Sequence, residues 1–93
     1  MFMVYTLCKY ADETLVTFSD IRKKDNGDEY IRVSFERPTE HGFDTVVFEL
    51  PSYNIIDKDG QYSDEEIALF KTVVERGAPY FYEWAREGGI KIA

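Results

Sequence analysis

The segment EYIRVSFER, residues 29–37, decides the fold class of this chain. Its apolar residues Ile31, Val33 and Phe35 alternate with polar or charged residues. A period of two residues is typical of a β-strand that has one face in the core and one face in water. The segment therefore predicts a half-buried strand.

The segments on either side predict two more strands. TLVTFSDI, residues 14–21, is rich in β-branched and aromatic residues, which favour strands. FDTVVFEL, residues 43–50, places Val46, Phe48 and Leu50 on one face. The three strands are expected to pair as an antiparallel meander.

The connections between these strands contain turn residues. Asn26-Gly27 predicts a tight hairpin, because both residues tolerate positive φ. In the next connection Pro38 is expected to end the strand, and Gly42 allows the chain to reverse. Pro51 is expected to stop the third strand.

The two ends of the chain leave alternatives open. The amino-terminal run MVYTLCKY, residues 3–10, favours a fourth strand paired through the ADE turn, and a short helix is the alternative. The final segment IKIA, residues 90–93, predicts either a short edge strand or a frayed tail.

The last third of the chain predicts helix. SDEE, residues 63–66, is a capping box in which Ser63 and Glu66 bond to each other's amides. Ile67, Phe70 and Val74 follow at helical spacing. Gly77 is expected to end this helix in a left-handed conformation.

A second, shorter helix is expected over PYFYEWARE, residues 79–87. Pro79 suits the first turn of a helix, and Gly88-Gly89 would end it. The predicted architecture is thus α+β: a meander of three or four strands, followed by a C-terminal helical hairpin packed on one sheet face. Residues 1–93 are expected to form a single domain.

Composition and charge narrow the functional classes. Hydrophobic residues make up 44% and aromatic residues 16% of the chain, which predicts a folded core. The formal net charge of −7 argues against direct nucleic-acid binding, because phosphates need a basic face. A single cysteine, Cys8, and the lack of a basic leader or a membrane-length apolar run favour a cytoplasmic protein with no membrane contact.

The segment NIIDKDGQYSDEEI, residues 54–67, resembles the calcium loop of an EF-hand over about a dozen residues. With Gly60 at loop position 6, the ligand positions 3, 5, 9 and 12 hold Asp57, Asp59, Ser63 and Glu66. The resemblance implies a weak metal site on these four residues. It departs from the pattern at position 1, where Ile55 offers no side-chain oxygen.

The same residues are also typical of a capped turn without metal. Asp57 and Asp59-Gly60 favour a turn, and a Glu66 that caps the helix is less free to bind an ion. Both interpretations stay open from the sequence.

The segment PYFYEW places four rings within six residues, and a short helix cannot turn all of them inward. Tyr80, Tyr82 and Trp84 are therefore predicted to form a partner-binding surface, because Tyr and Trp are favoured at interfaces. The partner is expected to be another protein, with a second copy of this chain as one form of it.

No catalytic motif stands out, so the sequence predicts a non-enzymatic interaction module without a cofactor. Cys8 and His41 would have to meet in the fold to act as a nucleophile pair. The alternatives are the weak calcium-binding domain and an acidic mimic of nucleic acid, whose carboxylates would imitate a phosphate track.

Overall fold

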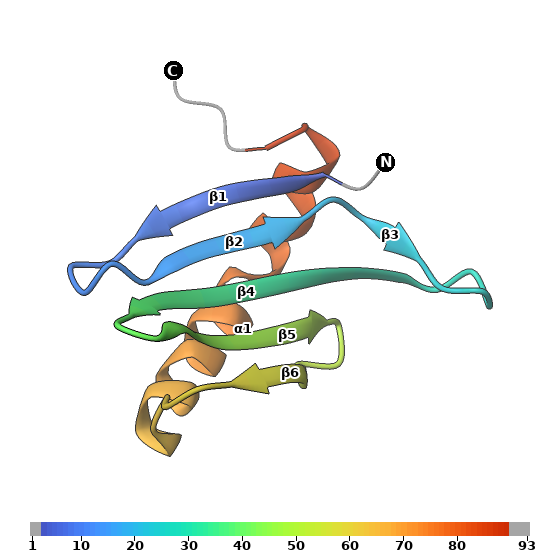
Figure 1. Cartoon of the computed structure of the whole chain (residues 1–93). Coiled ribbons are helices and arrows are strands. Elements are labelled where there is room, and N and C mark those ends of the chain that lie inside the picture. Colours follow the sequence, from blue (N-terminus) through green and yellow to red (C-terminus); the bar gives the residue numbers. More distant parts are fainter. Residues whose placement is uncertain (1–2, 90–93) are drawn as a thin grey trace.

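The computed structural model describes residues 3–89, which form one antiparallel sheet and one helix (Figure 1). The sheet order is β1-β2-β4-β5-β6, so apart from the short β3 the strands lie in the sheet in the order of the sequence, and β3 pairs with β4. The elements are β1 (Val4–Lys9), β2 (Leu15–Ser19), β3 (Arg22–Lys23), β4 (Glu29–Thr39), β5 (Gly42–Leu50), β6 (Asn54–Asp59) and α1 (Asp64–Arg86).

The α+β class and the antiparallel meander are confirmed. The segment 29–37 lies within β4, the central strand, which pairs with β2 on one side and β5 on the other. Its apolar residues Ile31, Val33 and Phe35 are fully buried, as the alternation predicts. The turn at Asn26-Gly27 is also confirmed, with Gly27 at φ +90° between β3 and β4.

The amino-terminal run is a strand, β1, which pairs antiparallel with β2. This confirms the favoured prediction over the helical alternative. The predicted tail, residues 90–93, lies outside the described residues.

The structure has more strands than predicted, because residues 54–59 form β6 instead of a turn. This segment pairs antiparallel with β5, from Glu49↔Asn54 to Thr45↔Asp59, with a register shift beside Ile56. It is an edge strand whose six residues are all exposed. A strand that buries neither face carries no alternation of apolar and polar residues, so the sequence gives no period-two signal there.

Pro38 does not end its strand, and this prediction is wrong. β4 continues to Thr39, with Pro38 opposite Phe43 of β5. Proline is tolerated in a strand where its nitrogen, which carries no hydrogen, does not face the carbonyl of a neighbouring strand. On the other side of β4, β2 pairs no further than Glu36, which leaves Pro38 without a neighbouring strand there.

The predicted helical hairpin is also wrong, since residues 64–86 form a single helix of 23 residues. Gly77 does not end it. A Cβ atom at Gly77 would lie 2.8 Å from Cε2 of Phe81, so the missing side chain makes room for the Phe81 ring one turn later. Phe70, Val74, Phe81 and Ala85 are the buried residues of α1, and they keep one face toward the sheet over its whole length.

Pro79 lies inside α1, although the sequence places it at the start of a second helix. Its side chain is exposed, so the ring meets solvent and not the core. The proline supplies no N–H to the carbonyl of Glu75, and water can solvate that carbonyl on the outer side of the helix. The continuous buried stripe outweighs this local cost.

Pro79→Ala is therefore expected to stabilise the domain by about 1–2 kcal/mol. Proline in a helix interior costs roughly 3 kcal/mol, and removing it restores this stability. The unfolded chain of the variant is more flexible, which lowers the gain by about 1 kcal/mol. Urea denaturation followed by circular dichroism measures the change. A neutral or destabilising effect would instead fit a proline in the first turn of a separate helix.

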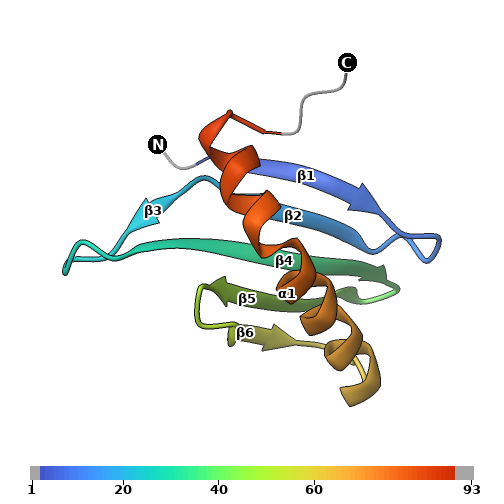
Figure 2. The same ribbon diagram turned by 180° about the vertical axis from the view of Figure 1, so that it is seen from behind.

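The helix crosses one face of the sheet diagonally (Figure 2). Its first half packs near Phe35, whose ring stacks on Phe70 with centroids 4.3 Å apart. Its second half packs near Phe18, whose ring lies 5.4 Å from Phe81. Within residues 3–89, no helix combines the length and the apolar character that crossing a bilayer requires.

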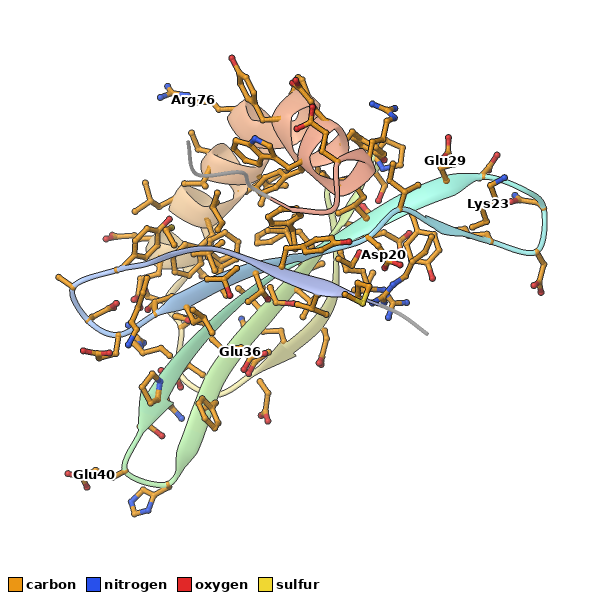
Figure 3. All side chains as sticks on the ribbon, turned by 90° about the horizontal axis from the view of Figure 1, so that it is seen from above. Asp20, Lys23, Glu29, Glu36, Glu40 and Arg76 are labelled. Atoms are coloured by element: carbon orange, nitrogen blue, oxygen red, sulfur yellow. The ribbon has the colours of Figure 1, made fainter. Side chains whose placement is uncertain are left out.

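The other face of the sheet, called the open face, is covered by no helix in the described part of the chain (Figures 1 and 2). Two hairpins extend past the helix, and Glu40 lies at the tip of the β4–β5 hairpin (Figure 3). Arg76 marks the outer side of α1 (Figure 3). The exposed surfaces that a partner could contact are thus the open face, the β6 edge and the outer side of α1.

Candidate functional site

A cluster of charged residues lies at one end of the core, next to the start of α1. Arg37 and Asp44 are opposite each other in β4 and β5, on the helix-covered face. The Arg37 guanidinium donates to Oδ2 of Asp44 from Nε at 3.0 Å and from Nη2 at 2.8 Å. The Asp44 side chain is only 4% exposed, and its Oδ1 accepts the backbone N–H of Gln61 at 2.7 Å. The cluster therefore joins the β4–β5 hairpin to the segment that leads into the helix.

The helix start is tied to the same arginine. Ser63 caps α1, its Oγ accepting the N–H of Glu66 at 3.1 Å, and Glu66 accepts the N–H of Ser63 at 3.0 Å. The predicted capping box is thus confirmed. Glu66 also accepts a hydrogen bond from Nη1 of Arg37. The guanidinium lies 4.6 Å from the centre of the Tyr62 ring, a cation–π contact.

The acidic members of this cluster hold lowered pKa values. The pKa of Asp44 is lowered first by the Gln61 backbone hydrogen bond and then by Arg37. The pKa of Glu66 is lowered first by the Ser63 backbone hydrogen bond and then by Arg37. Both groups favour the charged form in the fold, as expected for carboxylates that accept several hydrogen bonds.

The free energy of unfolding should therefore fall as the pH is lowered into the acid range. A carboxyl group with a lowered folded pKa contributes its full stability above its unfolded pKa, near 4, and loses it as pH falls through the folded value. We expect Asp44→Asn to cost about 2–3 kcal/mol at neutral pH, since a charged acceptor of three hydrogen bonds is lost. Urea denaturation between neutral pH and about pH 2 should then show a smaller acid-induced loss in the variant than in the wild type. Parallel pH profiles would contradict the assignment.

Two hydroxyls beside the cluster are buried without a hydrogen-bond partner in the described chain, those of Thr14 and Tyr62. Burial is the main cause that raises the pKa of Tyr62, while the nearby positive charge of Arg37 acts in the opposite direction. Tyr62 packs edge-on against Phe70, with ring centres 5.0 Å apart. The cluster is thus part of the packed core and anchors the helix.

The four predicted metal ligands are divided between this cluster and β6. Ser63 and Glu66 form the helix cap, and Glu66 also bonds to Arg37. Asp57 and Asp59 lie on β6, and Asp59 accepts the N–H of Gly60 at 2.9 Å. Among residues 3–89, no three His, Cys, Asp or Glu residues gather as a metal-binding group. Calcium binding stays a prediction, and a calorimetric titration would test it.

The three predicted partner-binding rings separate along α1. Tyr80 is 56% exposed and stacks on Trp84, with ring centres 5.8 Å apart. Trp84 is half-buried, and its ring lies 6.0 Å from those of Phe18 and Phe81. Tyr82 is half-buried under the Arg86 guanidinium, and its pKa is raised chiefly by burial and then by Glu29. Tyr80 and Trp84, called the aromatic pair, thus form one surface, and Tyr82 lies apart from it.

The open face contains a shallow hollow of about 460 Å³. Thr17, Ser34 and Val47, which are cross-strand neighbours on three adjacent strands, are among the residues that line it. Arg32 and Asp57 are among the residues around it, so the hollow carries both signs of charge. Short side chains between longer ones produce a hollow of this kind on an exposed sheet face, and its charged and polar residues are typical of a face in contact with water. The hollow therefore does not indicate a ligand site.

The ion pairs of the acidic side chains are relevant to the predicted mimicry of nucleic acid. The carboxylates of Asp12, Glu13, Asp20, Asp44, Glu49 and Glu66 each form an ion pair with an arginine or lysine. These pairs leave fewer uncompensated charges for a phosphate-like track. No specific feature of the described surface favours that alternative.

The fold and its surfaces define a small α+β domain, a meander sheet covered on one face by a single diagonal helix. No protein-family model matches the chain, and no curated protein or solved structure matches it.

Proposed function

We propose that this chain is a non-enzymatic protein–protein interaction module. The observation that carries the proposal is the aromatic pair. Tyr80 extends a large ring into solvent while Trp84 holds it from below, and Trp84 itself rests on Phe18 and Phe81. A ring fixed in this way loses little conformational freedom on binding, which is the property of interface hot spots.

The outer side of α1 extends this surface. Leu69 is 62% exposed, and it lies eleven residues, close to three full turns, before Tyr80. The two side chains therefore point in nearly the same direction, with Arg76 between them on the outer side of the helix (Figure 3). A partner that lies along α1 would bury both apolar groups and meet one cation.

The proposal keeps the cytoplasmic placement expected from the sequence, where the single thiol of Cys8 would stay reduced. Burial raises the pKa of this thiol, so it favours the unreactive protonated form. A second copy of the chain is one form that the partner takes in this proposal.

Cross-linking in the native cell, followed by mass spectrometry, tests the function. We expect the wild type to cross-link to a defined protein, or to itself, through the outer side of α1. Tyr80→Ala should reduce this yield at least several-fold, because hot-spot rings contribute most of the binding energy. Tyr80→Ala is the sharper variant, because Tyr82→Ala would also remove half-buried packing.

Glu75→Ala is the matched control, an exposed truncation on the same helix that points about 120° or more away from both Leu69 and Tyr80 and should leave the yield unchanged. Thermal unfolding checks that each variant is folded, and sedimentation measures self-association. The proposal is wrong if the wild type cross-links to no protein and sediments as a monomer, or if Tyr80→Ala leaves both results unchanged.

A further inference from the structure

The outer edge of β6 is open for pairing. β6 is the last strand of the sheet and pairs with β5 alone. All six of its residues are exposed, with Ile55 and Ile56 at 43% and 41%. No strand in the described part of the chain pairs with its other side. Such an edge presents backbone N–H and C=O groups that can pair with a strand of another chain.

The charges on this edge repeat with the period of a strand. Asp57 and Asp59 are opposite Val47 and Thr45 of β5, so both side chains lie on the open face. The two positions are about 7 Å apart along the strand. Neither carboxylate has an ion-pair partner among residues 3–89. A strand with cations at alternate positions would match this spacing.

The same charges disfavour pairing of β6 with β6 of a second copy. A two-fold axis between antiparallel strands places a central residue opposite itself. With Asp57 at the centre, this aspartate faces its own copy. With Lys58 at the centre, Asp57 faces Asp59 twice. Like charges directly opposite each other destabilise a strand pair in these two registers, whereas a basic segment meets opposite charges, so charge complementarity favours a basic segment over a second copy.

We propose that the β6 edge binds an extended segment of a partner protein that carries Lys or Arg at alternate positions. The segment adds a strand next to β6, and its main chain supplies the hydrogen bonds. Two of its cations lie over Asp57 and Asp59, and its alternate side chains pack near Ile55. In this mode of recognition the main chain gives affinity and the side chains give specificity. The net charge of −7 adds attraction for a basic segment at long range.

This inference deepens the proposed function and rests on it, but it uses a surface separate from the aromatic pair. The unpaired edge favours an extended chain, and the spacing of Asp57 and Asp59 independently favours cations at alternate positions.

The probe is a short fluorescent peptide in which Lys alternates with Thr or Val. A second peptide replaces each Lys by Glu, a third groups the lysines together, and a fourth carries N-methyl groups on its backbone. Fluorescence anisotropy measures the affinity, and hydrogen exchange measures the protection of the β6 amides. We expect the alternating Lys peptide to bind most tightly and to slow exchange in Asn54–Asp59.

The protein variant Asp57→Asn/Asp59→Asn should weaken this binding by about 3- to 30-fold, as two cross-strand ion pairs are lost. Both side chains are exposed, so the fold should be kept. The matched control is Glu65→Gln/Glu75→Gln, which removes the same charge from exposed positions on α1. This control separates recognition at β6 from the general attraction of an acidic protein.

Equal binding of the grouped-Lys or the N-methylated peptide would overturn the inference, as would an unchanged exchange rate in β6. Equal losses in the β6 variant and its α1 control would also overturn it. The proposed function is tested separately: a native partner lost with Tyr80→Ala but kept with Asp57→Asn/Asp59→Asn would support the module and reject the β6 edge.

Discussion

Gly60→Ala is expected to destabilise the domain by about 3 kcal/mol or more, a large share of the stability of a chain this size. Gly60 follows β6 and has φ +91°, a left-handed conformation that costs other residues about 1–2 kcal/mol. A Cβ atom there would lie 2.8 Å from the Cα of Asp44 and closer still to its Oδ1. The backbone of β5 would have to move, and the bond between Asp44 and Gln61 would be strained with it.

Gly27→Ala is the matched control for this effect. Gly27 has nearly the same φ, +90°, but no atom lies within 4 Å of a Cβ placed there. Its substitution carries the conformational cost alone, about 1–2 kcal/mol. Urea denaturation of both variants isolates the cost of the close approach to Asp44, which we expect to be about 2 kcal/mol or more. Equal losses in the two variants would show that Asp44 does not constrain Gly60.

The parts of the fold that the sequence predicts are those with a periodic pattern or a local hydrogen bond. The alternation of Ile31, Val33 and Phe35 gives the central strand, because the pleat turns these residues to one face. The capping box at Ser63 gives the helix start, because its bonds span only three residues.

The helical hairpin fails as a prediction because tertiary packing overrides two local signals. Gly77 and Pro79 indicate a break, yet both lie inside α1. The stripe Phe70, Val74, Phe81 and Ala85 continues across them at intervals of four, seven and four residues. This helical spacing is present in the sequence, and it is the signal that would have indicated one helix.

The candidate surfaces are less predictable than the fold. β6 has no apolar face, so it resembles a polar loop, and its two aspartates resemble metal ligands. Arg37 looks like the last charge of a strand, and only the pairing register brings it against Asp44. The sequence groups Tyr80 with Tyr82 in one predicted surface, whereas residues two apart in a helix point in nearly opposite directions, so the two rings lie apart.

Phe70→Ala is expected to cost about 3–5 kcal/mol, the range for a large ring removed from a core. The Phe70 ring stacks on Phe35 at 4.3 Å, meets Tyr62 edge-on at 5.0 Å and stacks on Tyr10 at 6.4 Å. It thus joins β4, the segment before α1 and the β1–β2 connection. Its loss leaves a void that these three rings cannot close without moving.

Leu69→Ala tests whether this cost belongs to the buried contact. Leu69 is the adjacent residue in α1, and its side chain is 62% exposed, so its truncation should change the free energy of unfolding by no more than about 0.5 kcal/mol. Chemical denaturation compares the two, and near-ultraviolet circular dichroism reports the loss of ring packing in Phe70→Ala alone. Similar losses for both would place the first half of α1 away from the sheet, and the anchoring of the helix through Phe70, Tyr62 and Arg37 would then be wrong.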